Sequence, residues 1–236
     1  MPISRRTGKN SARNSPWVEH NTMLKLFMTP GSCTTGIHIL LEELDMLFEV
    51  QLVNLMAGDH QSPAFRALNP KSTIPLLVTD DGRAISEFQA IAWWLARVYP
   101  KASLLPATLD EEVRVLEVMD YAVGTLHMQG FARIFTTDKF TPNAAEHESV
   151  RQQGKMIIEE GFAVIDALLT DTDYVVEKFS IADAALFYPE FWAVHSNIAL
   201  PPRCAAHYRT MLTRPAVRRV LLEEGYNPDR QAQAVA

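Results

Sequence analysis

The residues best suited to chemistry form a short turn, Thr29-Pro30-Gly31-Ser32-Cys33-Thr34-Thr35, between a predicted strand and a predicted helix. Cys33 would lie at the helix N-terminus, where unpaired backbone N–H groups and the helix dipole stabilise an anion. This position lowers the pKa of a thiol and raises its thiolate fraction. Position 36 is glycine, so a second thiol would have to come from another molecule. The alternative is a buried cysteine that only packs.

Two further segments carry groups that could hold a ligand. Ile74-Pro75 begins an apolar strand, where a proline is either an edge feature or part of a cis peptide bond in a tight turn. A cis bond would direct the backbone of Ile74 toward an extended peptide, whereas a plain loop proline would not. Ser86-Glu87-Phe88 opens a helix, which Ser86 can cap and whose positive end suits Glu87. In the functional interpretation, Glu87 binds an ammonium group.

A long predicted helix carries a stripe of residues around His127 that could line a site. Asp120 and Gly124 precede it and Phe131 follows it at helical spacings, so all four share one side. Glycine inside a helix costs roughly 1 kcal/mol relative to alanine, so Gly124 suggests room for a neighbour or a ligand. The stripe is expected to line a cleft, with a purely structural His127 as the alternative.

Other patterns indicate structure rather than chemistry. Ser180-Ile181-Ala182-Asp183 precedes an apolar run and is a helix-capping pattern, whose loss would cost about 1 kcal/mol. Cys204 follows Pro201-Pro202-Arg203 and is expected to be an inert packing thiol. The histidines, His38 among them, show no metal-ligand spacing with Asp, Glu or Cys, so no metal is expected. Gly-rich phosphate loops and nucleophile elbows are absent from the sequence.

Apolar periodicity predicts an α/β unit followed by an all-helical unit, which implies two domains. Strands are expected at 24–28, 48–53, 74–78 and 84–85, with helices at 34–45, 63–68 and 87–98. After a linker come long helices at 110–135 and 145–169, and shorter ones near 181–196, 203–212 and 215–223. A loose tail is expected from about residue 226. The expected inner side of the 110–135 helix is Val113, Leu116, Met119, Val123 and Leu126.

Composition excludes several classes of protein. The chain has 236 residues, 47% apolar and 21% charged, with no apolar run long enough to span a membrane and no secretory signal. Residues 1–22 carry a net charge of +3, and the remainder, with 18 basic and 27 acidic residues, carries −9. An acidic body offers no footprint for nucleic acid. Two cysteines cannot build a disulfide framework, so a reducing compartment, the cytoplasm, is expected.

The first 22 residues lack apolar periodicity and are rich in Ser, Asn and Arg. We expect an unfolded or draped extension. The alternatives are a transit peptide, translation from a start before Met23, an artificial tail, or an arm that packs through Trp17.

Together the segments from Met23 to Gly225 resemble a cytosolic-type glutathione S-transferase. The resemblance is carried by Lys25-Leu26-Phe27, Pro30-Gly31-Ser32-Cys33, Leu68-Asn69-Pro70-Lys71, Ile74-Pro75, Glu87 with Ala90-Ile91, Ser180-Ile181-Ala182-Asp183 and Arg214-Pro215-Ala216-Val217. It implies a thioredoxin-like glutathione-binding domain over 23–99, a linker over 100–109 and an all-helical domain over 110–229. It also implies a homodimer. Residues 1–22 would be a flexible extension and 230–236 a tail.

Pro-Gly-Ser-Cys, with Leu126-His127 and Gly130-Phe131, most resembles the bacterial beta class. The resemblance implies that Cys33 faces the glutathione sulfur and can form a mixed disulfide, and that His127 reaches the same site. Ser32 is an alternative hydrogen-bond donor to a thiolate.

The resemblance also implies how the rest of glutathione is held. Ile74-Pro75 would pair with its cysteinyl part, Glu87 would bind its γ-glutamyl ammonium group, and the backbone N–H of Phe88 would bind its carboxylate. His60 or Gln61 would bind the glycyl end. The sequence departs from the family pattern at Phe88, where a hydroxyl residue is usual, and at Met128, where the class has lysine.

The predicted function is transfer of glutathione, as co-substrate, to a small hydrophobic electrophile, or its exchange with a disulfide through Cys33. The predicted partners are these small molecules and a second copy of the chain, with no nucleic acid and no membrane. The alternative is a non-catalytic protein of the same fold that binds a ligand or a protein partner.

Overall fold

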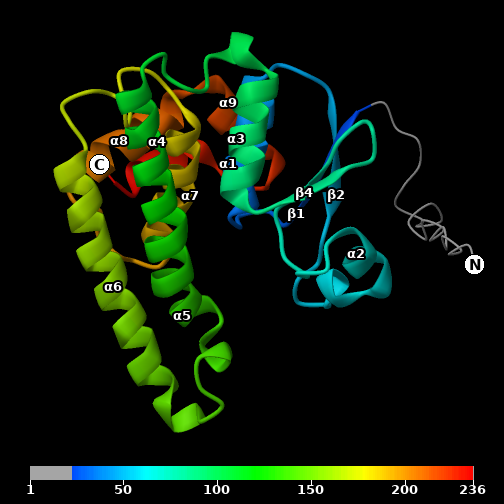
Figure 1. Cartoon of the computed structure of the whole chain (residues 1–236). Helices are drawn as coiled ribbons and strands as arrows, with labels where there is room; N and C mark the ends of the chain where they lie inside the picture. The colour runs from blue at the N-terminus through cyan, green and yellow to red at the C-terminus, as the bar shows by residue number, and fades with distance from the viewer. Residues whose placement is uncertain (1–22, 236) are drawn as a thin grey trace, which may run out of the picture.

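The first half of the molecule is built around a four-stranded mixed sheet (Figure 1). The computed structural model describes residues 23–235, so the expected extension over 1–22 lies outside the described residues. The strands are β1 (Leu24–Met28), β2 (Phe48–Leu52), β3 (Leu76–Val78) and β4 (Ala84–Ser86), in the order β2-β1-β3-β4. β1 pairs parallel with β2 and antiparallel with β3, and β3 pairs antiparallel with β4.

Helices cover both faces of this sheet. The helix α2 (Pro63–Leu68) lies on one face over a small cluster of Phe27, Val53, Phe65, Leu76 and Val78. The helices α1 (Thr34–Glu43) and α3 (Phe88–Val98) lie on the other face and join the main core (Figure 1). Short turns of 3₁₀-helix, at Asp59–Gln61 and Pro100–Ala102, complete this half. The thioredoxin-like fold expected from the resemblance is confirmed.

The second half is helical, as predicted. The helix α4 (Leu109–Tyr121) continues without a break through a π-helical segment, η4 (Ala122–Phe131), into α5 (Ala132–Phe135). After 3₁₀ turns at Thr137–Lys139 and Ala144–Glu146, the helix α6 (His147–Leu168) returns alongside η4 and α5 (Figure 1). The single helix expected over 110–135 is therefore continuous, but its middle is π-helical rather than α-helical.

The expected inner side of this helix is partly wrong. Val113 and Leu116 are 54% and 37% exposed, whereas Val115 and Val118 are buried. Both sets of residues are apolar, so hydrophobicity alone does not choose the face. The face is chosen by α7 (Ile181–His195), against which α4 packs.

Helix α7 runs through the centre of the molecule and is buried along almost its whole length. Its start confirms the predicted capping box: the side chains of Ser180 and Asp183 each accept a backbone N–H from the other end of the first turn. Around it lie α8 (Pro202–Thr213) and α9 (Pro215–Glu223). None of the helices within residues 23–235 has the length and hydrophobicity needed to cross a bilayer.

The end of the chain differs from the expected loose tail. Residues Pro228–Gln233 form a further helix, α10, against α8 and α9. The side chain of Asn227 accepts the N–H groups of Asp229 and Arg230, and Pro228 occupies the first helical position. Asn followed by Pro is a helix-start signal, and it outweighs the polar composition here.

Candidate active site

The turn that carries Cys33 is fixed by side chains from the helical half. Gly31 has a φ of +70°, and its N–H donates to Glu224 Oε2 at 2.7 Å. Its carbonyl accepts from Trp192 Nε1 at 2.7 Å. A Cβ at Gly31 would overlap the hydroxyl of Tyr226, so only glycine fits. Both halves of the molecule therefore shape this turn.

Cys33 lies at the N-cap of α1, as expected, but its thiol is not activated in this structure. It is 7% exposed, and its S–H donates to the Ile74 carbonyl, with 3.6 Å between sulfur and oxygen. Burial raises the pKa of Cys33 to about 12, and the nearby backbone and Ser32 hydrogen bonds do not offset this. The expected lowering of the pKa is therefore wrong, because desolvation outweighs the helix terminus.

Ser32 lies directly beside this thiol. Its hydroxyl shares a 2.7 Å hydrogen bond with that of Thr34, and it also accepts the Thr34 N–H at 3.2 Å. Ser32 is half-buried, so a ligand that reaches Cys33 also reaches a hydroxyl.

The Ile74–Pro75 bond is cis, which was one of the two interpretations of the sequence. This turn brings the carbonyl of Ile74 to the sulfur of Cys33. The two residues are 41 positions apart in the chain, so the sheet joins them.

Glu87 has a φ of +76°, a left-handed conformation that is rare outside glycine. Such strain is often found at functional sites. The carboxylate of Glu87 pairs with Lys71 Nζ at 2.8 Å, and the Ser86 hydroxyl also accepts from this ammonium at 3.1 Å. Ser86 does not cap α3, because it belongs to β4 and the N-cap residue is Glu87.

Phe88 turns away from solvent. It is 3% exposed, and its ring centroid lies 5.4 Å from that of Tyr188. It also fills the space above Gly36, where a Cβ would lie 2.7 Å from Phe88 Cε2. The side chain therefore belongs to the core, and only the backbone of Phe88 is left for a ligand. Its N–H lies in the first turn of α3, where helices leave such groups unpaired.

His127 lies on η4 and reaches the Cys33 turn through two aromatic residues of α7. Its Nδ1 lies 3.3 Å from the Tyr188 hydroxyl, and its ring lies 4.9 Å from Trp192, the residue that bonds to Gly31. Burial lowers the pKa of His127 to about 4, so the ring is neutral near pH 7. Tyr188 is buried, and Cys33 contributes to raising its pKa, after burial itself.

Tyr188 was not singled out by the sequence analysis. A signal for it was present, since a tyrosine in a largely apolar helix must find a partner for its hydroxyl. That partner is His127.

The stripe around His127 runs from the surface into the core. Asp120 is exposed and accepts from Gln89 Nε2 of α3 at 3.3 Å, whereas Phe131 is buried against Trp192. A Cβ at Gly124 would meet nothing within 4 Å, so this glycine borders open space. The room predicted at Gly124 is therefore present.

His60 lies on the 3₁₀ turn after β2 and is half-buried. Its Nδ1 is buried and has no hydrogen-bond partner among the described residues. Within residues 23–235, no hydrogen bond or ion pair joins His60 to Cys33 or Ile74. The structure thus leaves this buried nitrogen without a partner, and it does not place His60 at the thiol.

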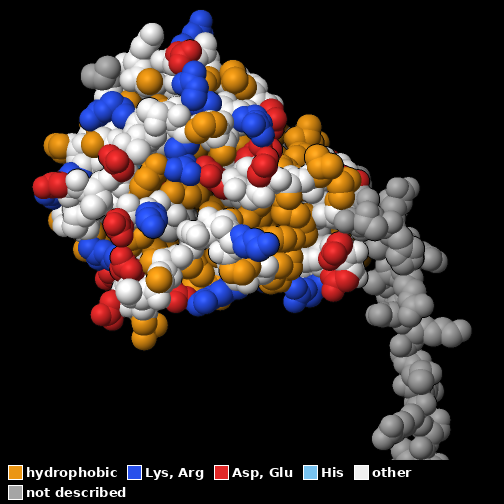
Figure 2. Space-filling model, turned by 90° about the horizontal axis from the view of Figure 1, so that it is seen from above, with side chains coloured by type: hydrophobic (Ala, Val, Ile, Leu, Met, Phe, Trp, Pro, Cys, Tyr) orange, Lys and Arg blue, Asp and Glu red, His pale blue; other side chains and the backbone are white. Residues whose placement is uncertain are grey.

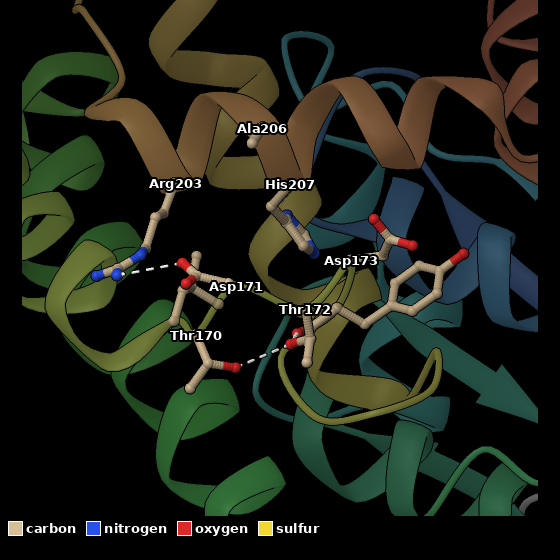
Figure 3. Close-up of a pocket in the computed structure, with 9 residues that line it drawn as sticks. Thr170, Asp171, Thr172, Asp173, Arg203, Ala206 and His207 are labelled. Carbon is tan, nitrogen blue, oxygen red and sulfur yellow. Dashed lines mark hydrogen bonds and ion pairs between the residues drawn. The ribbon is translucent and has the colours of Figure 1, made fainter.

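A separate cavity of about 190 Å³ lies between the loop 169–174 and α8 (Figure 3). Arg203 lines it and pairs with Asp171 at 3.3 Å, and His207 points into it from α8. His207 bonds to two buried carboxylates, Glu190 at 2.9 Å and Asp183 at 3.1 Å. None of the predicted site residues lines this cavity.

The chain is similar to known proteins both in sequence and in fold. The family model described as "Glutathione S-transferase, N-terminal domain" matches residues 31–98. The chain is 33% identical to glutathione S-transferase GstA of Escherichia coli O157:H7 over 207 residues, which cover 86% of this chain and 99% of that protein.

Solved structures are similar over nearly the same length. A sphingomonad glutathione S-transferase complexed with glutathione is 27% identical, with a TM-score of 0.72, over 85% of this chain and 98% of the other. The bacterial beta class glutathione S-transferase of Sphingomonas chungbukensis gives the same identity, TM-score and coverage.

Proposed function

Because the chain belongs to the glutathione S-transferase family, we propose that it joins reduced glutathione to a small hydrophobic electrophile, with the glutathione sulfur beside Cys33. The observation that carries this proposal is the contact between the Cys33 sulfur and the Ile74 carbonyl oxygen, which lie 3.6 Å apart. The turn that holds Cys33 is fixed by side chains from the helical half of the chain. A similar sphingomonad protein holds glutathione in its structure.

The proposed position of glutathione follows the charges around this turn. Its cysteinyl backbone would pair with Ile74. Its γ-glutamyl end carries one ammonium and one carboxylate group, which match the adjacent charges of Glu87 and Lys71. The half-buried imidazole of His60 would bind the glycyl carboxylate, and the N–H of Phe88 would add a bond at the γ-glutamyl end.

The proposed chemistry uses Cys33 as a hydrogen-bond donor. Since its pKa is about 12, Cys33 keeps its proton and can turn its S–H from Ile74 to the glutathione thiolate. Together with the first N–H groups of α1, this donor stabilises the anion that attacks the electrophile. Lowering the pKa of glutathione by two units is worth about 2.7 kcal/mol. A protonated Cys33 is a poor nucleophile, and for this reason we propose conjugation rather than disulfide exchange.

The electrophile would bind beside Gly124, between α3 and the stripe around His127. The open space beside Gly124 leaves room for a ligand, and the neutral imidazole of His127 places no charge there. We place the protein in a reducing compartment such as the cytoplasm, where Cys33 and Cys204 stay free, as they are here.

We also propose a homodimer. Leu109, Val113 and Leu116 form an exposed apolar row along one side of α4, at 73%, 54% and 37% exposure. Apolar side chains also gather on the face seen from above, toward the sheet (Figure 2). Contiguous exposed apolar patches mark protein–protein contacts.

The test is calorimetric titration of reduced glutathione into the protein at neutral pH, followed by a conjugation assay with an activated aryl chloride. We expect saturable binding at or below millimolar concentration. Cys33→Ala should bind glutathione but conjugate it more slowly, whereas Cys204→Ala should match the wild type. The absence of binding heat at several temperatures, or full activity in Cys33→Ala, would contradict the respective part of the proposal.

A further inference from the structure

A histidine of α1 faces the end of α9. His38 is 3% exposed, and its Nδ1 lies 3.0 Å from Glu224 Oε1. The other oxygen of Glu224 accepts from the Gly31 N–H and from the Thr35 hydroxyl, both at 2.7 Å. An ionised carboxylate only accepts hydrogen bonds. The proton of a neutral His38 is therefore fixed on Nδ1.

In this tautomer the second nitrogen, Nε2, carries a lone pair and no proton. Nε2 is buried and forms no hydrogen bond of acceptable geometry, although Glu223 Oε2 lies 3.3 Å away. Glu42 lies four residues further along α1, and one ligand atom from each of His38, Glu42 and Glu223 can be chosen so that all three lie within 4.8 Å of one another. A lone pair that faces two carboxylates is unfavourable unless a positive charge, either a proton on Nε2 or a metal ion, lies between them.

Arg219 neutralises only part of the negative charge of Glu42 and Glu223. Arg219 Nη1 pairs with one oxygen of Glu42 at 2.7 Å, which leaves the other oxygen for a second partner. The carboxylates of Glu42, Glu223 and Glu224 thus outnumber the guanidinium of Arg219. The side chain of Glu223 is half exposed, so it can move the short distance that metal coordination requires.

We propose that His38, Glu42 and Glu223 bind a divalent transition-metal ion, best matched by zinc, in a site that joins α1 to α9. One imidazole and two carboxylates are a donor set that zinc accepts, with water in the remaining position. Glu224 completes the pattern, since metal-bound histidines commonly donate their other N–H to a carboxylate. The role of the ion is structural: it ties the end of α9 to the helix that begins at Cys33.

The test uses untagged, chelator-treated protein titrated with Zn²⁺ by calorimetry and with Co²⁺ by visible absorption. We expect saturable binding of one ion per chain and a melting temperature that rises with Zn²⁺ concentration. Glu223→Gln should weaken binding by about tenfold or more and remove the rise. Glu160→Gln, which changes another exposed acid on α6, is the matched control and should behave as the wild type.

Two results would overturn the site. The first is wild-type protein that binds neither ion saturably, in which case only a proton lies between His38 and Glu223. The second is Glu223→Gln protein that binds as tightly as the wild type. Because Glu223 is on the surface, this variant is expected to fold, and loss of binding in it cannot be attributed to unfolding.

Discussion

Cys33 keeps its proton for two reasons that act on the same atom. The thiol is buried, so a thiolate would lose its hydration, and the S–H already donates to the Ile74 carbonyl. The backbone N–H groups at the start of α1 lower the pKa of Cys33, but by less than burial raises it. A ligand that displaces the Ile74 contact would meet an available donor.

The first prediction concerns alkylation of this thiol in the ligand-free protein. A pKa of about 12 instead of 9.0 leaves about a thousandfold less thiolate at pH 8, so reaction with iodoacetamide should be far slower than for an exposed thiol. The measurement is the labelling rate of Cys204→Ala protein against pH, with the unfolded protein as control. Fast labelling of the native protein at pH 7 would show that Cys33 is a thiolate.

At the scale of the elements, two glycines have opposite environments. Gly36 on α1 lies against Phe88 of α3 and the backbone of Ala184 on α7. Gly124 on η4 has open space beside it. Gly36 therefore allows α1, α3 and α7 to pack closely, whereas Gly124 leaves an open space beside η4.

The second prediction compares these two positions. Gly36→Ala should lower the free energy of unfolding by about 1–3 kcal/mol, because its Cβ would lie 2.5 Å from the Ala184 carbonyl oxygen. Gly124→Ala should raise it by about 0.5–1 kcal/mol, because alanine favours the helix, and should raise KM for the electrophile. Urea unfolding and steady-state kinetics measure both effects. Equal stability of the two variants would refute the packing argument.

Helices α7 and α8 are joined by the buried cluster of His207, Glu190 and Asp183. Burial opposes the charge on His207, but the two carboxylates outweigh it and raise the pKa of His207 to about 10. Burial also raises the pKa of Glu190 to about 7, against the opposing effect of His207. The folded cluster therefore binds protons more tightly than the unfolded chain.

The third prediction follows from this difference. A raised pKa stabilises the fold fully below the unfolded value of 6.5, and this contribution is lost as the pH rises toward 10. The free energy of unfolding, measured with urea, should therefore fall between pH 7 and pH 9.5. His207→Gln should lose that slope and cost about 3–5 kcal/mol at pH 7. His147→Gln, at the start of α6, should keep the wild-type slope, and a flat wild-type profile would contradict the argument.

At the scale of the whole molecule, the exposed row on α4 gives the fourth prediction. Val113→Glu with Leu116→Glu should halve the mass measured by light scattering, because charges in an apolar interface are costly. Met156 on α6 is 56% exposed, close to the value for Val113, so Met156→Glu is the control and should stay dimeric. A monomeric wild-type protein, or a double variant that remains a dimer, would refute this interface.

The order of strands and helices could be predicted from the sequence, because alternating or helical spacing and turn residues such as Pro30-Gly31 act locally. Features set by tertiary contact could not. The buried face of α4 depends on α7, and the inward turn of Phe88 depends on Gly36. The pKa of Cys33 depends on how deeply the turn is covered.

The candidate site was predicted to a similar extent. Cys33 and Ile74 do meet, and the cis bond before Pro75 is present. The pairing of Lys71 with Glu87 and the approach of Glu223 to His38 join residues far apart in the chain, so no local pattern shows them. His38 and Glu42, by contrast, have a helical spacing that the sequence analysis overlooked.

The backbone bonds of Gly31 have a consequence for domain exchange between relatives. A chimera made by cutting the chain at the linker would separate Gly31 from Trp192 and Glu224, which hold its two polar groups, and from Tyr226. A foreign helical half would have to supply an indole, a carboxylate and a phenol at the same places. Gly31, Trp192, Glu224 and Tyr226 must therefore be exchanged as a set, although they come from distant parts of the gene.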